Sequence, residues 1–475
     1  MRPRASAWMV VAAAALAGCA IGPDYKRPAV PQPETFRGEA AANAASLADA
    51  PWWEVFEDPI LKYLIQESFR ANYDVKIAAA RVQEARGQLG IARSELFPSL
   101  DYGVGAGRGN SISGPGGIAF KAPGGTTDVY SATMAASWEI DIWGRVRRSN
   151  EAALAALLAS EDAQRGVWLT LVSDVAQAYF ELLALDVQLQ IARDSTDSFQ
   201  RTYNLFLDRL QQGAASKLET ARALGALGGA QALVPQLESQ IVAKENQISI
   251  LLGNVPIAIP RGTPMYAQPV VPTVPTGLPS ALLERRPDLR QAEQQLVSAN
   301  ARIGVAKAEF FPKLSLTALF GTASPELSAL TSGGATVWAV AGVLSGPLFN
   351  AGRTLGNYRA TVAQWEQAKF QYEYVVINAF REVSDALTTL AKFAAAETGQ
   401  ETAVKALTEA VERSTDRYRI GLASYFEVLE ALQQLYPAQN ALAVIRQNRL
   451  LAYVRLYKAL GGGWNLADAQ WKEPR

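Results

Sequence analysis

Two regions of the chain alternate between apolar and polar residues, a pattern that predicts β-strands with one apolar face. The first region, residues 99–142, contains two such strands, separated by a loop rich in Gly, Pro and Ser from Gly109 to Gly125. Its alternating apolar positions are Leu100, Tyr102, Val104 and Ala106, and then Tyr130, Ala132, Met134, Ala136, Trp138, Ile140 and Ile142. The second region, residues 313–349, repeats the pattern with a shorter loop. The sequence therefore predicts two β-hairpins.

Long stretches without proline predict a helix after each hairpin. Residues 145–212 and 353–420 would each form a helix about 100 Å long, at about 1.5 Å per residue. Residues 217–252 and 425–460 would return as helices of about 36 residues each. A helix over residues 73–97 precedes the first hairpin and ends before a proline, which disfavours a helical residue ahead of it. The short and returning helices together match the long one in length, so all of them can pack as a wall of nearly constant height.

The apolar positions of the first long helix recur about every 3.67 residues. One stripe consists of Val167, Leu171, Val175, Ala178, Leu182, Leu185 and Leu189, and a second of Val172, Ala176, Tyr179 and Leu183. A strict heptad would have a period of 3.5 and supercoil to the left, whereas a period near 3.6 keeps helices almost straight. Two stripes imply two neighbours per helix, as in the wall of a cylinder. An ordinary long helical bundle is the alternative.

Segments of similar sequence recur at offsets of about 210 residues, which indicates a duplicated chain. Gly90-Ile-Ala-Arg-Ser-Glu-Leu-Phe-Pro98 matches Gly304-Val-Ala-Lys-Ala-Glu-Phe-Phe-Pro312. Gly213-Ala-Ala-Ser matches Gly421-Leu-Ala-Ser, and both glycines would supply helix-ending turns. The chain then divides into a first copy, a Pro-rich linker, a second copy and a tail, at residues 52–254, 255–279, 280–463 and 464–475.

The N-terminus has the features of a bacterial lipoprotein signal. Residues 1–18 combine a positive start with an apolar run too short to span a bilayer, and Cys19 is the only cysteine of the chain. Leu-Ala-Gly-Cys looks like a lipobox, at which diacylglycerol and fatty acyl groups are attached to Cys19; an ordinary signal peptide with a chance cysteine is the alternative. Ala20, in place of Asp, points to the outer membrane of a Gram-negative cell. Residues 19–51 should form an extended strap.

Aromatic residues cluster near the ends of the predicted strands, as in the girdles of membrane β-barrels. They are Phe97, Tyr130, Trp143, Phe310, Phe311, Trp338 and Phe349. A soluble sandwich can show the same pattern, but the lipobox upstream favours a membrane barrel. Because about eight strands are the minimum for such a barrel, four strands require the chain to oligomerise.

Composition narrows the functional classes. Lys+Arg and Asp+Glu are both 45, so the chain lacks the basic excess of a nucleic-acid-binding protein. The absence of histidine removes the commonest general base and metal ligand, and a single cysteine excludes intrachain disulfides. The glycine-rich stretch Gly103–Gly109 superficially resembles a phosphate-binding loop but lacks a helix directly after it. We therefore expect no enzyme activity, no metal or cofactor and no nucleic-acid partner.

Several motifs together resemble the TolC-like outer-membrane efflux channel family, in its lipoprotein (NodT/OprM-like) branch. They are Cys19 with Ile21-Gly-Pro-Asp-Tyr-Lys-Arg-Pro28, the doubled Glu-(Leu/Phe)-Phe-Pro, Asp141-Ile-Trp-Gly-Arg145, and the stretch from Tyr418 to Glu430. The resemblance implies a mostly helical homotrimer, with four strands per chain in a 12-stranded β-barrel continued by a periplasmic α-barrel. It implies outer-membrane lipid, a periplasmic adaptor and an inner-membrane pump of the resistance-nodulation-division (RND) type as partners. It also implies a passive duct without bond chemistry.

Two acidic residues just after the second glycine turn form the candidate pore constriction. Glu427 and Glu430 lie three apart on one helical face, and threefold symmetry would make each a ring of carboxylates that favours cations. A solvated helix face is the alternative. The resemblance implies a gating role for Tyr418 and a bonding partner at Glu219, and it shows that Ala423 replaces a common family Arg. Three basic residues are candidates to substitute for that Arg: Arg209, Lys217 and Arg419.

The expected function is therefore the exit duct of a tripartite efflux pump for drugs or other small molecules. A type I protein-secretion duct is the alternative within the same class. A structural coiled-coil lipoprotein without a pore is the alternative from another class, but it would not need the alternation from Tyr130 to Ile142.

Overall fold

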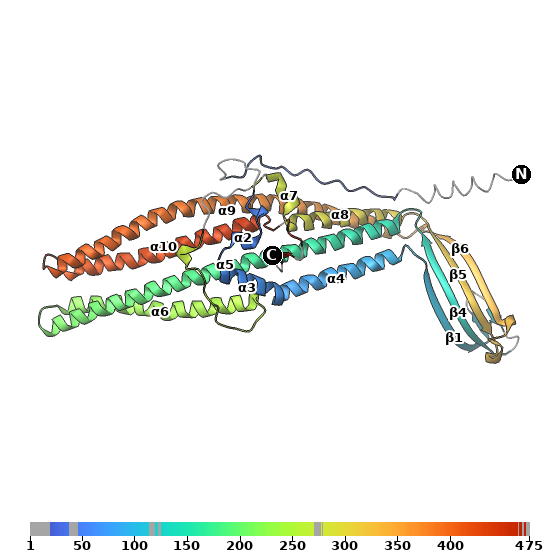
Figure 1. Cartoon of the computed structure of the whole chain (residues 1–475). Coiled ribbons are helices and arrows are strands. Elements are labelled where there is room, and N and C mark those ends of the chain that lie inside the picture. The colour runs from blue at the N-terminus through green and yellow to red at the C-terminus, as the bar shows by residue number, and fades with distance from the viewer. Residues whose placement is uncertain are drawn as a thin grey trace. The chain divides into compact units, whose positions relative to one another are not determined.

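The chain forms two compact units in the computed structural model, each built from separate stretches of sequence. Figure 1 labels the helices and strands of both units. The structure describes residues 20–37, 46–113, 119–121, 125–269, 277, 279–463, 465–467 and 470–471. The predicted signal segment and Cys19 lie outside these residues. The first unit takes the chain up to Ala29, Ala80–Glu161 and Gln291–Glu373, and the second takes Val30–Ala79, Asp162–Arg290 and Tyr374–Arg475.

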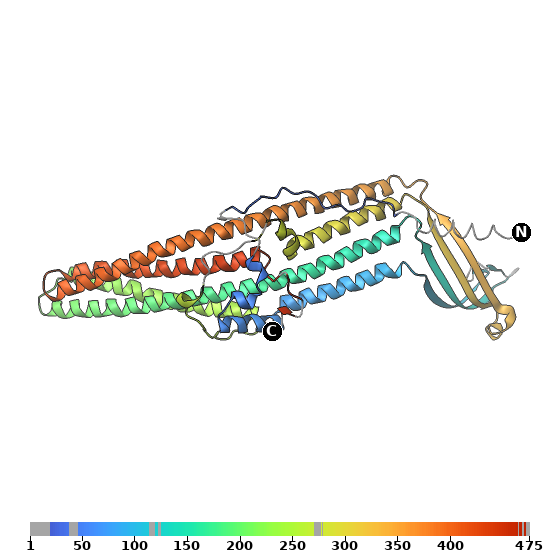
Figure 2. The same ribbon diagram turned by 45° about the horizontal axis from the view of Figure 1, so that its top comes forward.

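A four-stranded antiparallel sheet in the first unit joins the two predicted hairpins (Figure 2). The strands pair in the order β1 (Ser99–Gly109), β4 (Thr127–Ile140), β5 (Lys313–Ser324) and β6 (Thr336–Ser345). The central pair, β4 and β5, comes from different copies of the repeat. Two short strands that the sequence pattern did not predict, β2 (Ser111–Ser113) and β3 (Ala119–Lys121), form a separate ladder in the first loop. Among the described residues, β1 and β6 each pair with only one strand of this sheet.

One face of the sheet carries rows of exposed apolar side chains. The register aligns Tyr102 with Met134, Met134 with Phe320, and Phe320 with Trp338, so these residues form one row across all four strands. Each of them is more than half exposed. The predicted alternation is confirmed, because apolar positions two apart share this face. An exposed apolar band of this kind is what the lipid-facing side of a membrane barrel requires.

Helical segments of the first unit pack beside one another in an order that mixes the two copies. They belong to α4 (Tyr73–Ser94), α5 (Arg145–Gln211), α8 (Pro287–Ala308) and α9 (Arg353–Arg419). Val82 of α4 and Leu157 of α5 share a buried apolar cluster. The hydroxyl of Ser298 in α8 donates a hydrogen bond of 2.9 Å to the carbonyl oxygen of Ala152 in α5. Helix α5 therefore has one neighbour from each copy.

The second unit contains the returning helices and several short helices. They are α2 (Trp52–Val55), α3 (Pro59–Ala71), α6 (Lys217–Leu251), α7 (Leu282–Arg285) and α10 (Tyr425–Ala459). Both predicted stripes of α5 supply core residues of this unit, at most 1% exposed: Val172, Val175, Ala176, Ala178, Tyr179 and Leu182. The double stripe thus has neighbours on both sides.

Several elements differ from their predicted bounds. Helix α4 ends at Ser94 instead of Phe97. Strand β4 ends at Ile140 instead of Ile142, because the side chain of Asp141 already caps α5. Strand β6 ends at Ser345 because Pro347 follows and cannot donate to a ladder. Helix α3 was not predicted, although Asp58 is a typical cap and accepts from the N–H groups of its first turn.

Candidate pore gate at the glycine turns

Each long helix ends in the same tight turn at a glycine. Gly213 and Gly421 both have a φ of +76°, in the left-handed region that favours glycine. After α5 the N–H of Ala214 donates to the carbonyl oxygen of Arg209 at 2.8 Å, and after α9 the corresponding bond to the carbonyl oxygen of Arg417 is 2.9 Å. The two copies therefore use the same helix cap, which turns the chain into α6 and α10.

A buried apolar cluster beside the turns connects the two copies. It contains Phe199 of α5, Leu227 of α6 and Leu429 of α10. Tyr425, the first residue of α10, packs against this cluster, and its hydroxyl shares a hydrogen bond of 2.7 Å with the hydroxyl of Thr202 in α5. The turns of the first and second copies are thus held together by packing and by a polar contact.

The two candidate pore acids lie on the exposed side of α10. Glu427 and Glu430 are exposed, whereas Leu429 between them is buried. The Nε atom of Arg417 lies 3.6 Å from Oε2 of Glu427, in a pair whose side chains are both about half exposed. Such exposed pairs contribute only about 0–1 kcal/mol. Among the residues that the structure describes, Glu430 makes one polar contact, a long one of 3.5 Å with Gln434. Both carboxylates therefore remain accessible to ions.

Tyr418 and Glu219, which the resemblance pairs, have different partners in the structure. Glu219 forms a capping box with Ser216: its Oε2 atom accepts from the Ser216 N–H at 2.7 Å, and the Ser216 hydroxyl accepts from the Glu219 N–H at 3.3 Å. The hydrogen bonds from Ser216 lower the pKa of Glu219. The Tyr418 hydroxyl is buried and has no hydrogen-bond partner among the described residues. The structure does not bring the two side chains into hydrogen-bond contact.

The three basic candidates for the missing family Arg differ in their surroundings. The guanidinium carbon of Arg209 lies 5.1 Å from the centre of the Tyr418 ring. Arg419 lies 3.8 Å from Asp416 in its own helix. Lys217 makes no ion pair with any residue that the structure describes. Of the three, Arg209 is the one in contact with a predicted gate residue.

Three further residues of this region were not found from the sequence: Arg417, Tyr425 and Thr202. Arg417 meets Glu427 across a turn, at a separation that matches no helical period. Thr202 and Tyr425 meet between copies, more than 200 residues apart in the sequence. Only the presence of polar residues beside both glycine turns could have pointed to them.

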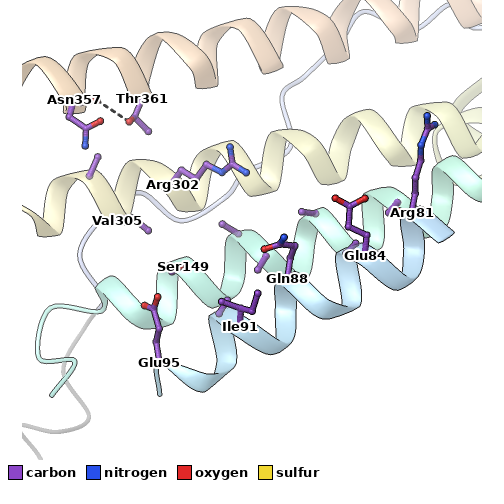
Figure 3. Close-up of a pocket in the computed structure, with 17 residues that line it drawn as sticks. Arg81, Glu84, Gln88, Ile91, Glu95, Ser149, Arg302, Val305, Asn357 and Thr361 are labelled. Atoms are coloured by element: carbon purple, nitrogen blue, oxygen red, sulfur yellow. Dashed lines mark hydrogen bonds between the residues drawn. The ribbon is translucent and has the colours of Figure 1, made fainter. Parts of the chain in front are cut away.

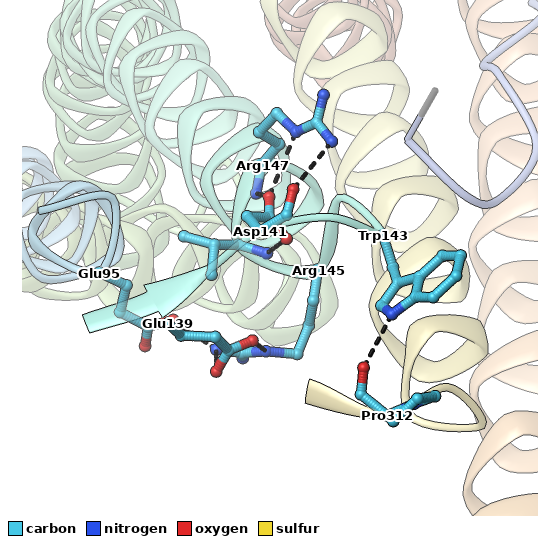
Figure 4. Close-up of polar contacts among 8 residues, drawn as sticks. Glu95, Glu139, Asp141, Trp143, Arg145, Arg147 and Pro312 are labelled. Carbon is cyan, nitrogen blue, oxygen red and sulfur yellow. Dashed lines mark hydrogen bonds and ion pairs between the residues drawn. The ribbon is translucent and has the colours of Figure 1, made fainter. Parts of the chain in front are cut away.

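A second polar cluster occupies the junction between β4 and α5 (Figure 4). Arg145 donates two hydrogen bonds to Glu139, of 2.8 and 3.0 Å, and Asp141 accepts from two backbone N–H groups in the first turn of α5. The indole N–H of Trp143 donates to the carbonyl oxygen of Pro312 at 2.8 Å. The motif from Asp141 to Arg145 therefore sets the angle at which the strand enters the helix.

The strap after Cys19 docks on the first unit through charged side chains. Arg148 of α5 donates to Asp24 at 2.8 Å. Arg27 makes two hydrogen bonds of 2.7 Å to Glu293 of α8, which also accepts from the Tyr25 hydroxyl at 3.1 Å. Burial, together with the Glu293 charge, raises the pKa of Tyr25. The strap is therefore fixed to helices from both copies.

An open cavity of about 750 Å³ lies on the other side of the same helices (Figure 3). Arg81, Glu84 and Arg302 are among its charged lining residues, and several alanines line it as well. Helix α8 contacts the strap through Glu293 and Asn300 and lines the cavity with Arg302. At 100° per residue, Arg302 projects from the side of α8 opposite to the two strap contacts. The strap and the cavity therefore lie on opposite faces of this helical layer.

Comparisons with known proteins agree with this arrangement. The family described as "Outer membrane efflux protein" matches residues 64–254 and 278–462, once in each copy. The chain is 35% identical over 464 residues to the probable efflux pump outer membrane protein TtgC of Pseudomonas putida, covering 96% of this chain and 95% of that protein. It is 34% identical over 456 residues to the cation efflux system protein CusC of Escherichia coli K12, covering 95% and 98%.

Solved channel structures share the fold. The open state of the MtrE outer membrane channel of Neisseria gonorrhoeae matches with a TM-score of 0.85 at 30% identity, covering 94% of this chain and 99% of that one. A CusC structure matches with a TM-score of 0.81 at 32% identity, covering 94% and 100%. These neighbours are trimeric outer-membrane channels, so the predicted fold class, location and passive channel function, without enzyme activity, are confirmed. The chain belongs to the outer membrane efflux protein family.

Proposed function

We propose that three copies of this chain form the exit duct of a tripartite efflux pump, through which small molecules leave the cell. The observation that carries this proposal is the open sheet, in which β1 and β6 each lack a second partner among the described strands. Strand directions alternate from β1 to β6, so β6 of one copy can pair antiparallel with β1 of the next. Three copies would close a barrel of 12 strands, whereas one copy falls below the minimum of about eight.

The docked N-terminus supports a lipid anchor on Cys19 at the edge of this barrel. The N–H of Ile21 donates to the carbonyl oxygen of Trp143 at 3.0 Å, and Ala20 packs against Gly144 so closely that a Cβ on Gly144 would lie 2.6 Å from the Ala20 Cα. Both contacts lie directly after β4. Cys19 directly precedes Ala20 in the sequence. We propose diacylglycerol and fatty acyl groups on Cys19 as the only attached groups.

The glycine turns would form the periplasmic entrance, where a periplasmic adaptor and an RND-type pump engage the duct. Each 67-residue helix follows a strand, is about 100 Å long and ends in its glycine turn. At this entrance Glu427 and Glu430 would form two rings of carboxylates, beside the Tyr418 and Glu219 of each chain. Related proteins are named for antibiotic, toluene and cation efflux, and we propose small molecules of this range as cargo.

Planar-bilayer recording of the purified lipoprotein tests both the duct and its gate. The unaltered protein should conduct as a trimer. The double variant Glu427→Gln with Glu430→Gln should lose much of its cation selectivity, because it removes six carboxylates per trimer (two in each of three chains) from the entrance.

Glu409→Gln is the matched control, since it removes a similarly exposed carboxylate from α9 and should leave selectivity unchanged. A stable monomer that never conducts would refute the duct. Conduction with unchanged selectivity in the double variant would exclude the two glutamates from the pore.

A further inference from the structure

The arginine in contact with the candidate gate tyrosine comes from the other copy of the repeat. Arg209 lies in the last turn of α5, and Tyr418 lies in the last turn of α9. The guanidinium carbon of Arg209 is 5.1 Å from the centre of the Tyr418 ring, within the range of a cation–π interaction. Arg209 is partly buried and forms no ion pair with any carboxylate in the part of the chain that the structure describes. The ring of Tyr418 is therefore its principal contact.

The contacts of Tyr418 run through its ring and not through its hydroxyl. Tyr425 packs edge-on against the ring, with centres 4.9 Å apart and an interplanar angle of 79°. Tyr425 is in turn bonded to Thr202 of α5. The Tyr418 hydroxyl, in contrast, is buried without a hydrogen-bond partner among the described residues. A continuous series of side-chain contacts thus connects the two copies, running from Arg209 through Tyr418 and Tyr425 to Thr202.

Two other charged groups near the turns have partners of their own. Arg417 pairs with Glu427, and Glu219 is held by Ser216. The positive charge of Arg209 contributes to the lowered pKa of Glu219, but less than the hydrogen bonds from Ser216 do. Arg209 is thus attracted by Glu219 while it remains stacked on Tyr418.

We propose that Arg209 is the latch of the entrance, holding the turn of the second copy to that of the first through the face of Tyr418. This inference rests on the proposed gate at the glycine turns. Position 423, in the turn of the second copy, is alanine in this chain and supplies no charge there. Opening the entrance would separate the guanidinium from the ring, so a weaker stack should favour the open state.

Five variants test the latch in planar bilayers. Arg209→Gln and Tyr418→Leu should each raise the open probability by about two- to thirty-fold, the range that a cation–π contact supports. The double variant should gain no more than either single variant, because both remove the same contact. Tyr418→Phe should behave like the unaltered channel, because the hydroxyl has no partner, and Arg209→Lys should be intermediate.

Hydrogen exchange provides a readout that does not depend on conduction. Amides of residues 203–222 and 411–430 should exchange faster in Arg209→Gln and in Tyr418→Leu, but not in Tyr418→Phe. The latch is refuted if Arg209→Gln matches the unaltered protein in both assays, or if Tyr418→Phe opens as readily as Tyr418→Leu. In neither case would the cation selectivity set by Glu427 and Glu430 change, so failure of the latch is distinguishable from failure of the gate itself.

Discussion

Loss of the Glu293 carboxylate should release the N-terminal strap from the first unit. The side chain of Glu293 is 12% exposed and accepts hydrogen bonds from Arg27 and Tyr25. Glu293→Ala removes the acceptor of all these bonds. Alanine is also a strong helix former, so α8 itself should stay intact.

The size of the effect follows from the contacts. Hydrogen bonds to a charged group contribute about 1.5–3 kcal/mol. Because the Arg27 side chain is 40% exposed, solvent weakens the pair, and we take about 1–3 kcal/mol for the whole set. A change of 1.4 kcal/mol is tenfold in population. The undocked strap should therefore become roughly 5- to 150-fold more populated.

Trypsin cleavage after Lys26 measures this population. When the strap redocks faster than the protease cuts, the cleavage rate follows the undocked fraction and should rise by the same factor. The product beginning at Arg27 can be quantified by mass spectrometry. Glu34→Ala, which removes an exposed carboxylate further along the strap, should leave the rate unchanged. Equal rates for Glu293→Ala and the unaltered protein would refute the view that these contacts hold the strap.

Two further predictions concern the sheet and the helix cap. Phe320→Arg introduces a charge into the apolar row and should destabilise the membrane-inserted trimer by about 2–4 kcal/mol. Leu319→Arg, on the opposite face of the sheet, should be tolerated. The temperature at which the trimer dissociates on a gel compares the two variants, and equal losses of stability would contradict the assigned lipid face. The lowered pKa of Glu219 means that its cap stabilises α6 fully above the usual Glu value of 4.5 and loses this effect as the pH falls through the lowered pKa. Glu219→Gln should therefore speed amide exchange at the start of α6 near neutral pH but not in strong acid, and a pH-independent difference would contradict the cap.

Most of the architecture could be predicted because it depends on local patterns. Helix α5 ends within one residue of the predicted Gln212, since a proline-free stretch runs to a glycine that adopts φ of +76°. The alternation along β4 also held, up to the point at which Asp141 turns to cap α5. The end of a strand was less predictable, because it depends on whether the next side chain bonds to a helix.

The amino-acid sequence by itself determined the duplication, the lengths of the helices, the apolar face of the strands and the acidic pair at Glu427 and Glu430. Each of these follows from the spacing of residue types within a single element. Only the tertiary structure decided which distant partners meet: Arg209 with Tyr418, and Thr202 with Tyr425. Packing brings side chains from distant parts of the chain together in pairs, and a single pair leaves no periodic trace in either segment.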